Sequence, residues 1–214
     1  MQKSHAIILA AGSFDTKYLE NFDLKNSLFI VLDGAANQFQ NTNYCPDYII
    51  GDFDSIHQDA LSFFKHKTQL IKNPDQDTTD LEKALIFIQQ FDVQKITILG
   101  AAQGERTDHL LYNLSLLKKF YHPDQTLEIH QDQEIFCFLK DKNFSFLGQK
   151  NEVVALFGAP KAQINSKGLV WELNAYSVIW LEQSSACNRI LNEKVELNVQ
   201  GEVFLIRPNH VKKN

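Results

Sequence analysis

In the first half of the chain, short runs of hydrophobic residues alternate with longer amphipathic segments. We expect strands at residues 6–11, 28–32, 48–50, 69–71 and 96–99. These runs show little polar alternation, which is typical of a parallel sheet covered on both faces. Helical spacing of apolar residues predicts helices over 79–91 and 107–121. Strands and helices in this alternation predict an open α/β sheet.

After about residue 123 the pattern changes to short hydrophobic segments joined by Gly, Asn or charged turns. We expect strands at 128–139, 144–147, 153–157, 169–173, 178–181, 195–199 and 203–206, with no helix among them. This pattern predicts a β-rich second domain, either a sandwich or a barrel. We place the two domains at 1–125 and 126–214.

Composition argues against several classes of protein. A net charge of -5 without a Lys/Arg cluster argues against binding to nucleic acid or to an anionic membrane surface. No apolar run approaches the roughly 20 residues that a membrane-spanning helix needs. Cys45, Cys137 and Cys187 are too far apart to suggest a disulfide framework or a zinc motif. We therefore expect a cytoplasmic protein with a small-molecule ligand.

The first candidate site is a pair of aspartates at the end of an expected strand. Asp52 and Asp54 follow a buried run, where the two-residue period aims both carboxylates to one side. Two such charges about 5 Å apart repel by roughly 3 kcal/mol at an effective dielectric near 20, so a cation would stabilise them. Oxygen ligands favour magnesium over zinc. A solvated turn with helix-capping aspartates is the alternative.

A second acidic segment enters the first expected helix. Thr79 and Glu82 form a capping box, and the helix dipole favours an acid at Asp80. Capping does not require Asp75 and Asp77 as well. Three aspartates in this short segment therefore extend the candidate metal site.

Two further loops complete the candidate site. In the loop before the second helix, Gly104 would let a phosphate approach backbone N–H groups, and Arg106 can hold that phosphate bidentately. Asp33 ends another expected strand. Because the carboxyl ends of parallel strands meet at one edge of a sheet, where open α/β sheets bind ligands, these residues are expected to converge there.

Taken in order, the segments DGAAN, PDYIIGDFDS, DQDTTDLEKAL and GAAQGERTDHLLYNLSLL resemble the thiamine pyrophosphokinase family. SKGLVWEL, which begins at Ser166, and SSACN, which begins at Ser184, resemble that family's T-x-G-L-x-W-x-L and S-x-S-N elements. The resemblance covers residues 33–188. The chain departs from the family pattern at Ala35, Glu105 and Cys187, where the family usually has glycine, glycine and serine.

The resemblance implies a Rossmann-like ATP- and magnesium-binding catalytic domain followed by a β-sandwich domain for thiamine binding and dimerisation. It implies a homodimer with thiamine bound between subunits. The implied reaction transfers the pyrophosphoryl group of ATP to the hydroxyl of thiamine and gives thiamine diphosphate and AMP. Two alternatives stay open, another magnesium-dependent phosphotransferase or phosphohydrolase, and a thiamine or nucleotide sensor without turnover.

The resemblance also implies roles by position. The magnesium ligands would be Asp52, Asp54 and Asp80, and the catalytic residues Asp54, Asp80 and Arg106. The nucleotide would contact Asp33, Gly34, Asn37, Gln76, Thr79, Gly104, Arg106 and Asp108. Trp171, Ser185 and Asn188 would lie near thiamine. The alternation of Leu169, Trp171 and Leu173 also fits a strand that buries all three in the core.

Overall fold

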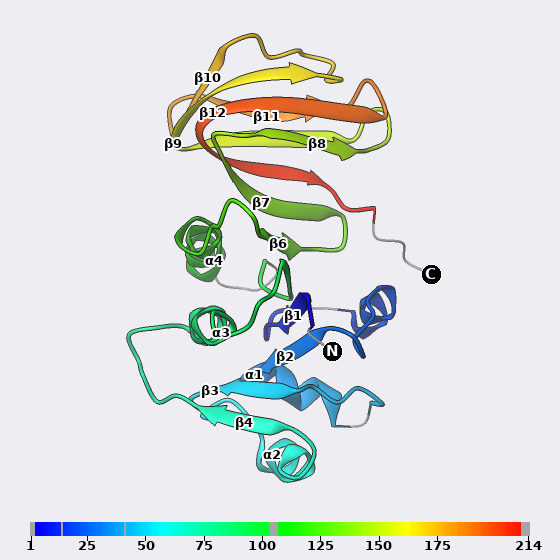
Figure 1. Ribbon diagram of the computed structural model, residues 1–214, viewed down its shortest axis with the longest axis vertical. Coiled ribbons are helices and arrows are strands. Elements are labelled where there is room, and N and C mark those ends of the chain that lie inside the picture. The colour runs from blue at the N-terminus through cyan, green and yellow to red at the C-terminus, as the bar shows by residue number, and fades with distance from the viewer. Residues whose placement is uncertain (1–2, 14, 41, 103–106, 211–214) are drawn as a thin grey trace. The chain divides into compact units, whose positions relative to one another are not determined.

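The structure is a computed structural model that describes residues 3–13, 15–40, 42–102 and 107–210 (Figure 1). The chain divides into two compact units between Gln131 and Asp132. Each unit is described separately below.

The first unit is built on a parallel sheet with strand order β6-β5-β1-β2-β3-β4. Its strands are β1 (His5–Leu9), β2 (Leu28–Leu32), β3 (Tyr48–Gly51), β4 (Gln69–Lys72), β5 (Lys95–Leu99) and β6 (Thr126–His130). The central strands are buried along nearly their whole length, as their continuous apolar runs predict. The five strands expected in the first half of the chain are confirmed.

Helices connect these strands. They are α1 (Asp33–Ala36), α2 (Gln58–Phe64), α3 (Asp80–Ile88) and α4 (Thr107–Lys119), with 3₁₀ turns η1 (Thr16–Asn21) and η2 (Asn37–Phe39). The two predicted helices are α3 and α4, and both end before the expected residue. In α3 the stripe formed by Leu81, Ala84, Leu85 and Ile88 is buried, which explains the amphipathic spacing.

The second unit is antiparallel. Its strands are β7 (Glu134–Lys140), β8 (Asn143–Leu147), β9 (Val153–Lys167), β10 (Tyr176–Ile179), β11 (Ser184–Arg189) and β12 (Lys194–Pro208). The long strands β9 and β12 pair with each other; β9 also pairs with β10 and β11, and β12 with β7 and β8. The inward residues of these strands form one hydrophobic cluster. The expected absence of helices is confirmed for residues 132–210.

Several strand boundaries in this half differ from the prediction. The segment 128–139 is not one strand, because a turn separates β6 from β7, and β6 pairs in parallel with β5 in the first unit. The segments 195–199 and 203–206 belong to a single strand, β12. Gly201, with a φ of 100°, lies where the pairing of β12 with β9 shifts register, which explains the interrupted pattern.

The segment 169–173 is a loop, so the strand predicted there is wrong. Gly168 ends β9 with a φ of 100°, a conformation that favours glycine. Leu169 and Leu173 then point into the core, but Trp171 between them is exposed. Alternating spacing therefore does not place Trp171 in the core.

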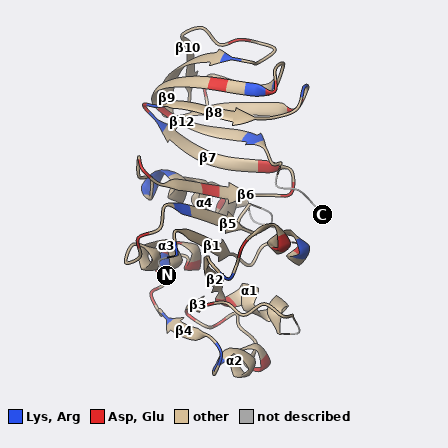
Figure 2. Cartoon of the chain, turned by 45° about the vertical axis from the view of Figure 1, so that its right-hand side comes forward, with Lys and Arg blue, Asp and Glu red and all other residues tan. Residues whose placement is uncertain are grey.

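Charged residues of both signs occur on the strands and helices of each unit (Figure 2). Among the helices of the described residues, none has the length and apolar character that a membrane crossing requires.

A buried carboxylate joins α3 to α4. Glu82 is 1% exposed and accepts hydrogen bonds from the Tyr112 hydroxyl and the Lys119 ammonium group. Burial opposes ionisation of this carboxyl group, but the bonds from Lys119 and Tyr112 outweigh that effect and lower the pKa of Glu82. The charge is therefore kept, and it fixes the start of α3 relative to α4.

We expect Glu82→Gln to lower the free energy of unfolding by about 1–3 kcal/mol, because the amide replaces a charged acceptor of two hydrogen bonds. Urea unfolding followed by circular dichroism measures this change. The matched control is Glu202→Gln, which breaks the surface ion pair with Lys140 and should cost about 1 kcal/mol or less. Equal losses in the two variants would contradict the role given to Glu82.

Candidate active site

Three aspartates from two neighbouring strand ends form an acidic cluster. Asp33 follows β2 and begins α1, and Asp52 and Asp54 follow β3. Because β2 and β3 are parallel partners, their carboxyl ends lie side by side. One carboxylate oxygen from each aspartate lies within 4.8 Å of the others. We call Asp33, Asp52 and Asp54 the acidic cluster.

Asp33 is the buried member of this cluster. One carboxylate oxygen accepts the N–H of Gly34 at 2.5 Å, and the other accepts the N–H of Phe53 at 2.9 Å. A Cβ atom on Gly51 would lie 2.6 Å from the Cγ atom of Asp33, so glycine is required there. Burial raises the pKa of Asp33 to about 6, the nearby charge of Asp80 adds to this rise, and the two N–H bonds oppose it.

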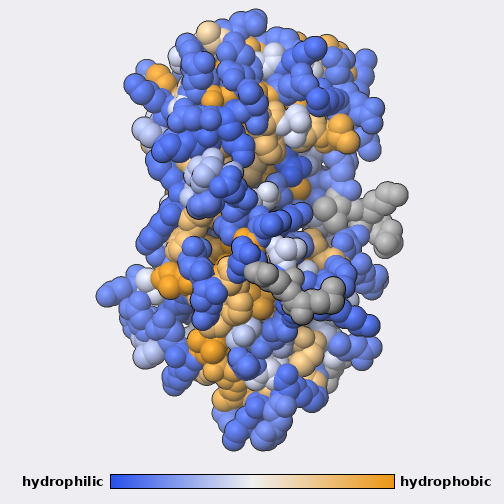
Figure 3. All heavy atoms as spheres, viewed as in Figure 1, coloured by the Kyte–Doolittle hydropathy of each residue, from blue (hydrophilic) through white to orange (hydrophobic). Residues whose placement is uncertain are grey.

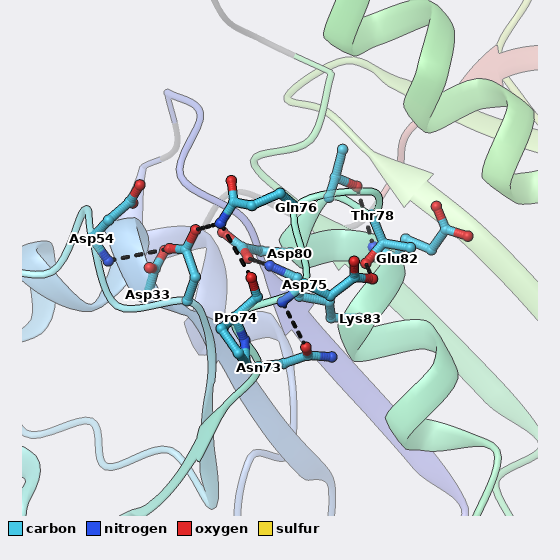
Figure 4. Close-up of polar contacts among 12 residues, drawn as sticks. Asp33, Asp54, Asn73, Pro74, Asp75, Gln76, Thr78, Asp80, Glu82 and Lys83 are labelled. Atoms are coloured by element: carbon cyan, nitrogen blue, oxygen red, sulfur yellow. Dashed lines mark hydrogen bonds and ion pairs between the residues drawn. The ribbon is translucent and has the colours of Figure 1, made fainter.

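Asp52 is half-buried and Asp54 is exposed, and hydrogen bonds hold both side chains (Figure 4). Asp52 accepts a hydrogen bond from the side-chain amide of Gln76 at 2.9 Å and from the N–H of Asp54 at 3.1 Å. The Gln76 amide is the main cause of a lowered pKa for Asp52. Asp54 accepts the hydroxyl of Ser55 at 2.8 Å. Gln76, which was expected among the nucleotide contacts, thus orients Asp52 in this structure.

Asn37 braces the loop that carries Asp52 and Asp54. Its amide nitrogen donates to the carbonyl of Ser55 at 2.9 Å, and its amide oxygen accepts the N–H of His57 at 2.7 Å. Both ends of the side chain are thus used within the protein. The structure gives Asn37 a supporting role beside the predicted nucleotide site.

The start of α3 brings another acid to the same place. Thr79 caps the helix by accepting the N–H of Glu82 at 3.3 Å, which is one half of the predicted capping box, while the two Glu82 oxygens bond to Tyr112 and Lys119. Asp80 interacts with the Asp33 side chain and forms an ion pair with Lys83 at 3.0 Å. The side chain of Lys83 is only 3% exposed. Sequence reasoning missed Lys83, although its position three residues after Asp80 on a helix places the two side chains on one face.

Asp75 has a local structural role. Its carboxylate accepts the N–H of Asp77 at 3.0 Å and the hydroxyl of Thr78 at 2.7 Å. These bonds shape the turn before α3, so Asp75 is not a member of the acidic cluster.

A pocket of about 440 Å³ lies beside the acidic cluster. Its lining includes Asp33, Gly34, Thr79 and Asp80, together with the loops after β1 and β5 and the first turns of α4. Sequence reasoning missed the loop after β1, residues 10–12, although the end of a parallel strand is a sufficient signal for it.

A larger hollow of about 840 Å³ lies at the opposite edge of the sheet, where the strands begin. Open parallel sheets bind ligands at the carboxyl edge, so we assign the smaller pocket to function.

The remaining expected nucleotide contacts come from residues 104–108, which follow β5 in the sequence. Gly104 and Arg106, with Glu105 between them, lie outside the described residues. Asp108 is exposed in the first turn of α4 and is not part of the acidic cluster. His109 in the same turn contributes to the pocket lining.

The acidic cluster fits a hard divalent cation. All its donors are carboxylate oxygens, which magnesium prefers. Asp33 is buried although its charge is disfavoured there, and a cation would offset that cost. The expected ligand set was Asp52, Asp54 and Asp80; the structure groups Asp33 with Asp52 and Asp54 and places Asp80 beside Asp33.

The three residues expected near thiamine lie together in the second unit. Asn188 is buried, and its amide donates to the Trp171 carbonyl at 2.8 Å and accepts the Trp171 N–H at 3.3 Å. The same amide donates to the Ser185 hydroxyl at 3.3 Å. Trp171 itself is 59% exposed. Other exposed hydrophobic side chains of this unit include Leu147, Trp180 and Leu181. On the face of the molecule shown in Figure 3, hydrophobic residues are scattered among hydrophilic ones.

Comparison with known proteins gives consistent results. Residues 19–129 match the family described as thiamin pyrophosphokinase, catalytic domain. Thiamine pyrophosphokinases 1 and 2 of Arabidopsis thaliana are 28% and 32% identical to this chain over 175 residues, which is 75% of the chain. The chain spans 64% of the length of these relatives.

Solved structures agree in fold. The Bacillus subtilis thiamine pyrophosphokinase superposes with a TM-score of 0.84 at 19% identity and covers 96% of this chain and 99% of its own. The yeast thiamin pyrophosphokinase superposes with a TM-score of 0.83 at 15% identity and covers 100% and 88%. Because the catalytic-domain family matches more than half of its 214 residues, this chain belongs to the thiamin pyrophosphokinase family.

Proposed function

We propose that this chain is a magnesium-dependent thiamine pyrophosphokinase, which transfers the pyrophosphoryl group of ATP to the hydroxyl of thiamine and releases AMP. The observation that carries the proposal is the acidic cluster beside a pocket at the carboxyl edge of the sheet, in a member of this family. The proposal includes a Rossmann-like ATP domain, a β-sandwich domain, and a cytoplasmic homodimer that binds thiamine between its subunits.

The proposed roles in phosphoryl transfer follow from position and charge. Asp33, Asp52 and Asp54 would hold magnesium, with Asp80 beside them. Bound magnesium neutralises charge on the phosphoryl oxygens during transfer. Asp54 and Asp80 are our candidates to accept the proton of the attacking hydroxyl.

The nucleotide would occupy the pocket beside the acidic cluster. Gly34 and Thr79 line this pocket together with Asp33, and Gln76 holds Asp52 of the acidic cluster. Gly104, Arg106 and Asp108 would complete the nucleotide contacts. Arg106 would stabilise charge on the phosphates and on the departing AMP, since a guanidinium group binds phosphate bidentately.

Thiamine would bind against Trp171. The thiazolium ring carries a permanent positive charge, and an exposed indole face attracts such a cation by about 0.5–2 kcal/mol. Trp171 is exposed enough to offer that face, and Asn188 and Ser185 lie directly behind its backbone. In this proposal Asn188 supports the aromatic residue from inside the unit.

The reaction products test the proposed activity. We expect incubation with thiamine, ATP and Mg²⁺ to give thiamine diphosphate and AMP in equal amounts, and chelation of the metal to stop the reaction. Chromatography of both products measures this. Formation of ADP or free phosphate would indicate another phosphotransferase or phosphohydrolase, and binding without turnover would indicate a sensor.

We expect Asp52→Asn, Asp54→Asn and Asp80→Asn each to lower kcat by about 10²-fold or more, because each removes a negative charge from the metal site. Steady-state kinetics and circular dichroism separate catalysis from folding. The control is Asp75→Asn, which removes the same charge from the neighbouring turn but lies outside the acidic cluster. Normal turnover in all three variants would rule out this metal site.

We expect Trp171→Ala to raise the Michaelis constant for thiamine roughly 2- to 30-fold, the factor that corresponds to the loss of one cation–π contact. The Michaelis constant for ATP and the melting temperature should change little, because the indole is exposed. Kinetics and thermal melting measure both. Loss of about 3–5 kcal/mol of stability with normal thiamine affinity would instead indicate a packing role.

A further inference from the structure

The loop that carries Trp171 is anchored on both sides by the core. It leaves β9 at Lys167, and Leu169 and Leu173 are buried on either side of the exposed indole. The N–H of Ser166 donates to the carbonyl of Leu173 at 2.9 Å and closes the loop at its base. The loop is therefore compact, but its backbone N–H groups lack the regular partners of a strand.

One side chain supplies acceptors for these groups. An oxygen of Glu172 accepts the N–H of Gly168 at 2.7 Å and the N–H of Leu169 at 3.2 Å. Its other oxygen accepts the hydroxyl of Ser166. That hydroxyl oxygen in turn accepts the N–H of Leu173 at 2.8 Å. The carboxylate of Glu172 thus links the start of the loop to its end.

The neighbouring strand fixes the middle of the loop. The N–H of Val170 donates to the carbonyl of Arg189 in β11 at 2.8 Å. Asn188 binds both the N–H and the carbonyl of Trp171. Asn188 therefore holds the backbone of Trp171 directly, and Glu172 holds the two ends of the loop that contains it. An indole on such a backbone is exposed in a defined direction, as a binding face requires.

We propose that Glu172 is a positioning residue, which fixes the loop 168–173 so that the Trp171 indole forms a preorganised face for thiamine. The inference rests on the proposed function. Glu172 acts through hydrogen bonds to the loop and does not itself contact the substrate. Its side chain is exposed, so its main contribution is the order of the loop, and the core of the unit does not depend on it.

The chain allows a direct measurement of this order, because it has only two tryptophans. In a Trp180→Phe background, all tryptophan fluorescence comes from Trp171. Time-resolved anisotropy then reports the local motion of the indole, and thiamine titration of the same protein reports binding. Steady-state kinetics supply the Michaelis constants.

In this background we expect Glu172→Ala to speed the local depolarisation of Trp171 and to raise the dissociation constant for thiamine about three- to tenfold, the factor that corresponds to one net hydrogen bond. The Michaelis constant for ATP and kcat at saturating thiamine should not change. Glu172→Gln should keep most of the parent's anisotropy and thiamine affinity, because an amide oxygen can accept both N–H groups and the amide nitrogen can donate to Ser166. The matched control is Glu182→Ala, an exposed glutamate without a side-chain hydrogen bond among the described residues.

Unchanged anisotropy and unchanged thiamine affinity in Glu172→Ala would overturn the proposal, even if the melting temperature falls. If Glu172→Ala does not fold, Ser166→Ala applies the same test by removing the hydroxyl that bridges Glu172 and Leu173. A parent protein that neither binds nor converts thiamine would refute the proposed function. The anisotropy comparison would still decide whether Glu172 orders the indole.

Discussion

Asp33 places a carboxylate inside the protein at the junction of β2, β3 and α1, and the candidate site is built around it. Burial disfavours the charged form, as its raised pKa shows, while N–H bonds from Gly34 and Phe53 favour it. The carboxyl group fits only because Gly51 has no side chain. Phe53 donates from a backbone with a φ of 68°, which is uncommon for a residue other than glycine. This strain and buried charge oppose stability, and such features persist where function requires them.

The charges around Asp33 are only partly balanced within the described residues. Asp80 has an ion pair with the buried Lys83, and Asp52 is stabilised by the neutral amide of Gln76. The charge of Lys83 also helps to lower the pKa of Asp52, but its ion pair is with Asp80 and not with a member of the acidic cluster. A divalent ion would complete the balance at the same edge of the sheet where the pocket proposed for the nucleotide opens. Metal binding and nucleotide binding would then depend on one set of loops.

The sequence predicts elements whose periodicity extends over enough residues. The helices α3 and α4 meet this condition, and the strands β1 to β5 are instead marked by short apolar runs. The helices α1 and α2 have only four and seven residues and show no clear helical period. Tertiary proximity is harder to predict. Strand ends indicated that the aspartates converge, but spacing along the chain could not show that Asp33 groups with Asp52 and Asp54 while Asp80 pairs with Lys83. Likewise, the spacing of Leu169, Trp171 and Leu173 is the same in a strand and in a loop whose ends are both buried.

The loops at the acidic cluster and the loop that carries Trp171 are held in the same way. In each, a carboxylate accepts backbone N–H groups of an irregular segment, Asp33 in the first unit and Glu172 in the second. Such bonds order a loop before a ligand arrives and so reduce the entropy lost on binding. The two carboxylates differ in burial, since Asp33 is 2% exposed and Glu172 is an exposed residue. At position 172 an amide oxygen can accept both N–H groups, because one oxygen of Glu172 binds both. At position 33 the two N–H groups bind different oxygens, so an amide could accept only one of them. In the proposed metal site the carboxylate of Asp33 would also face a cation, so its negative charge would be needed there as well.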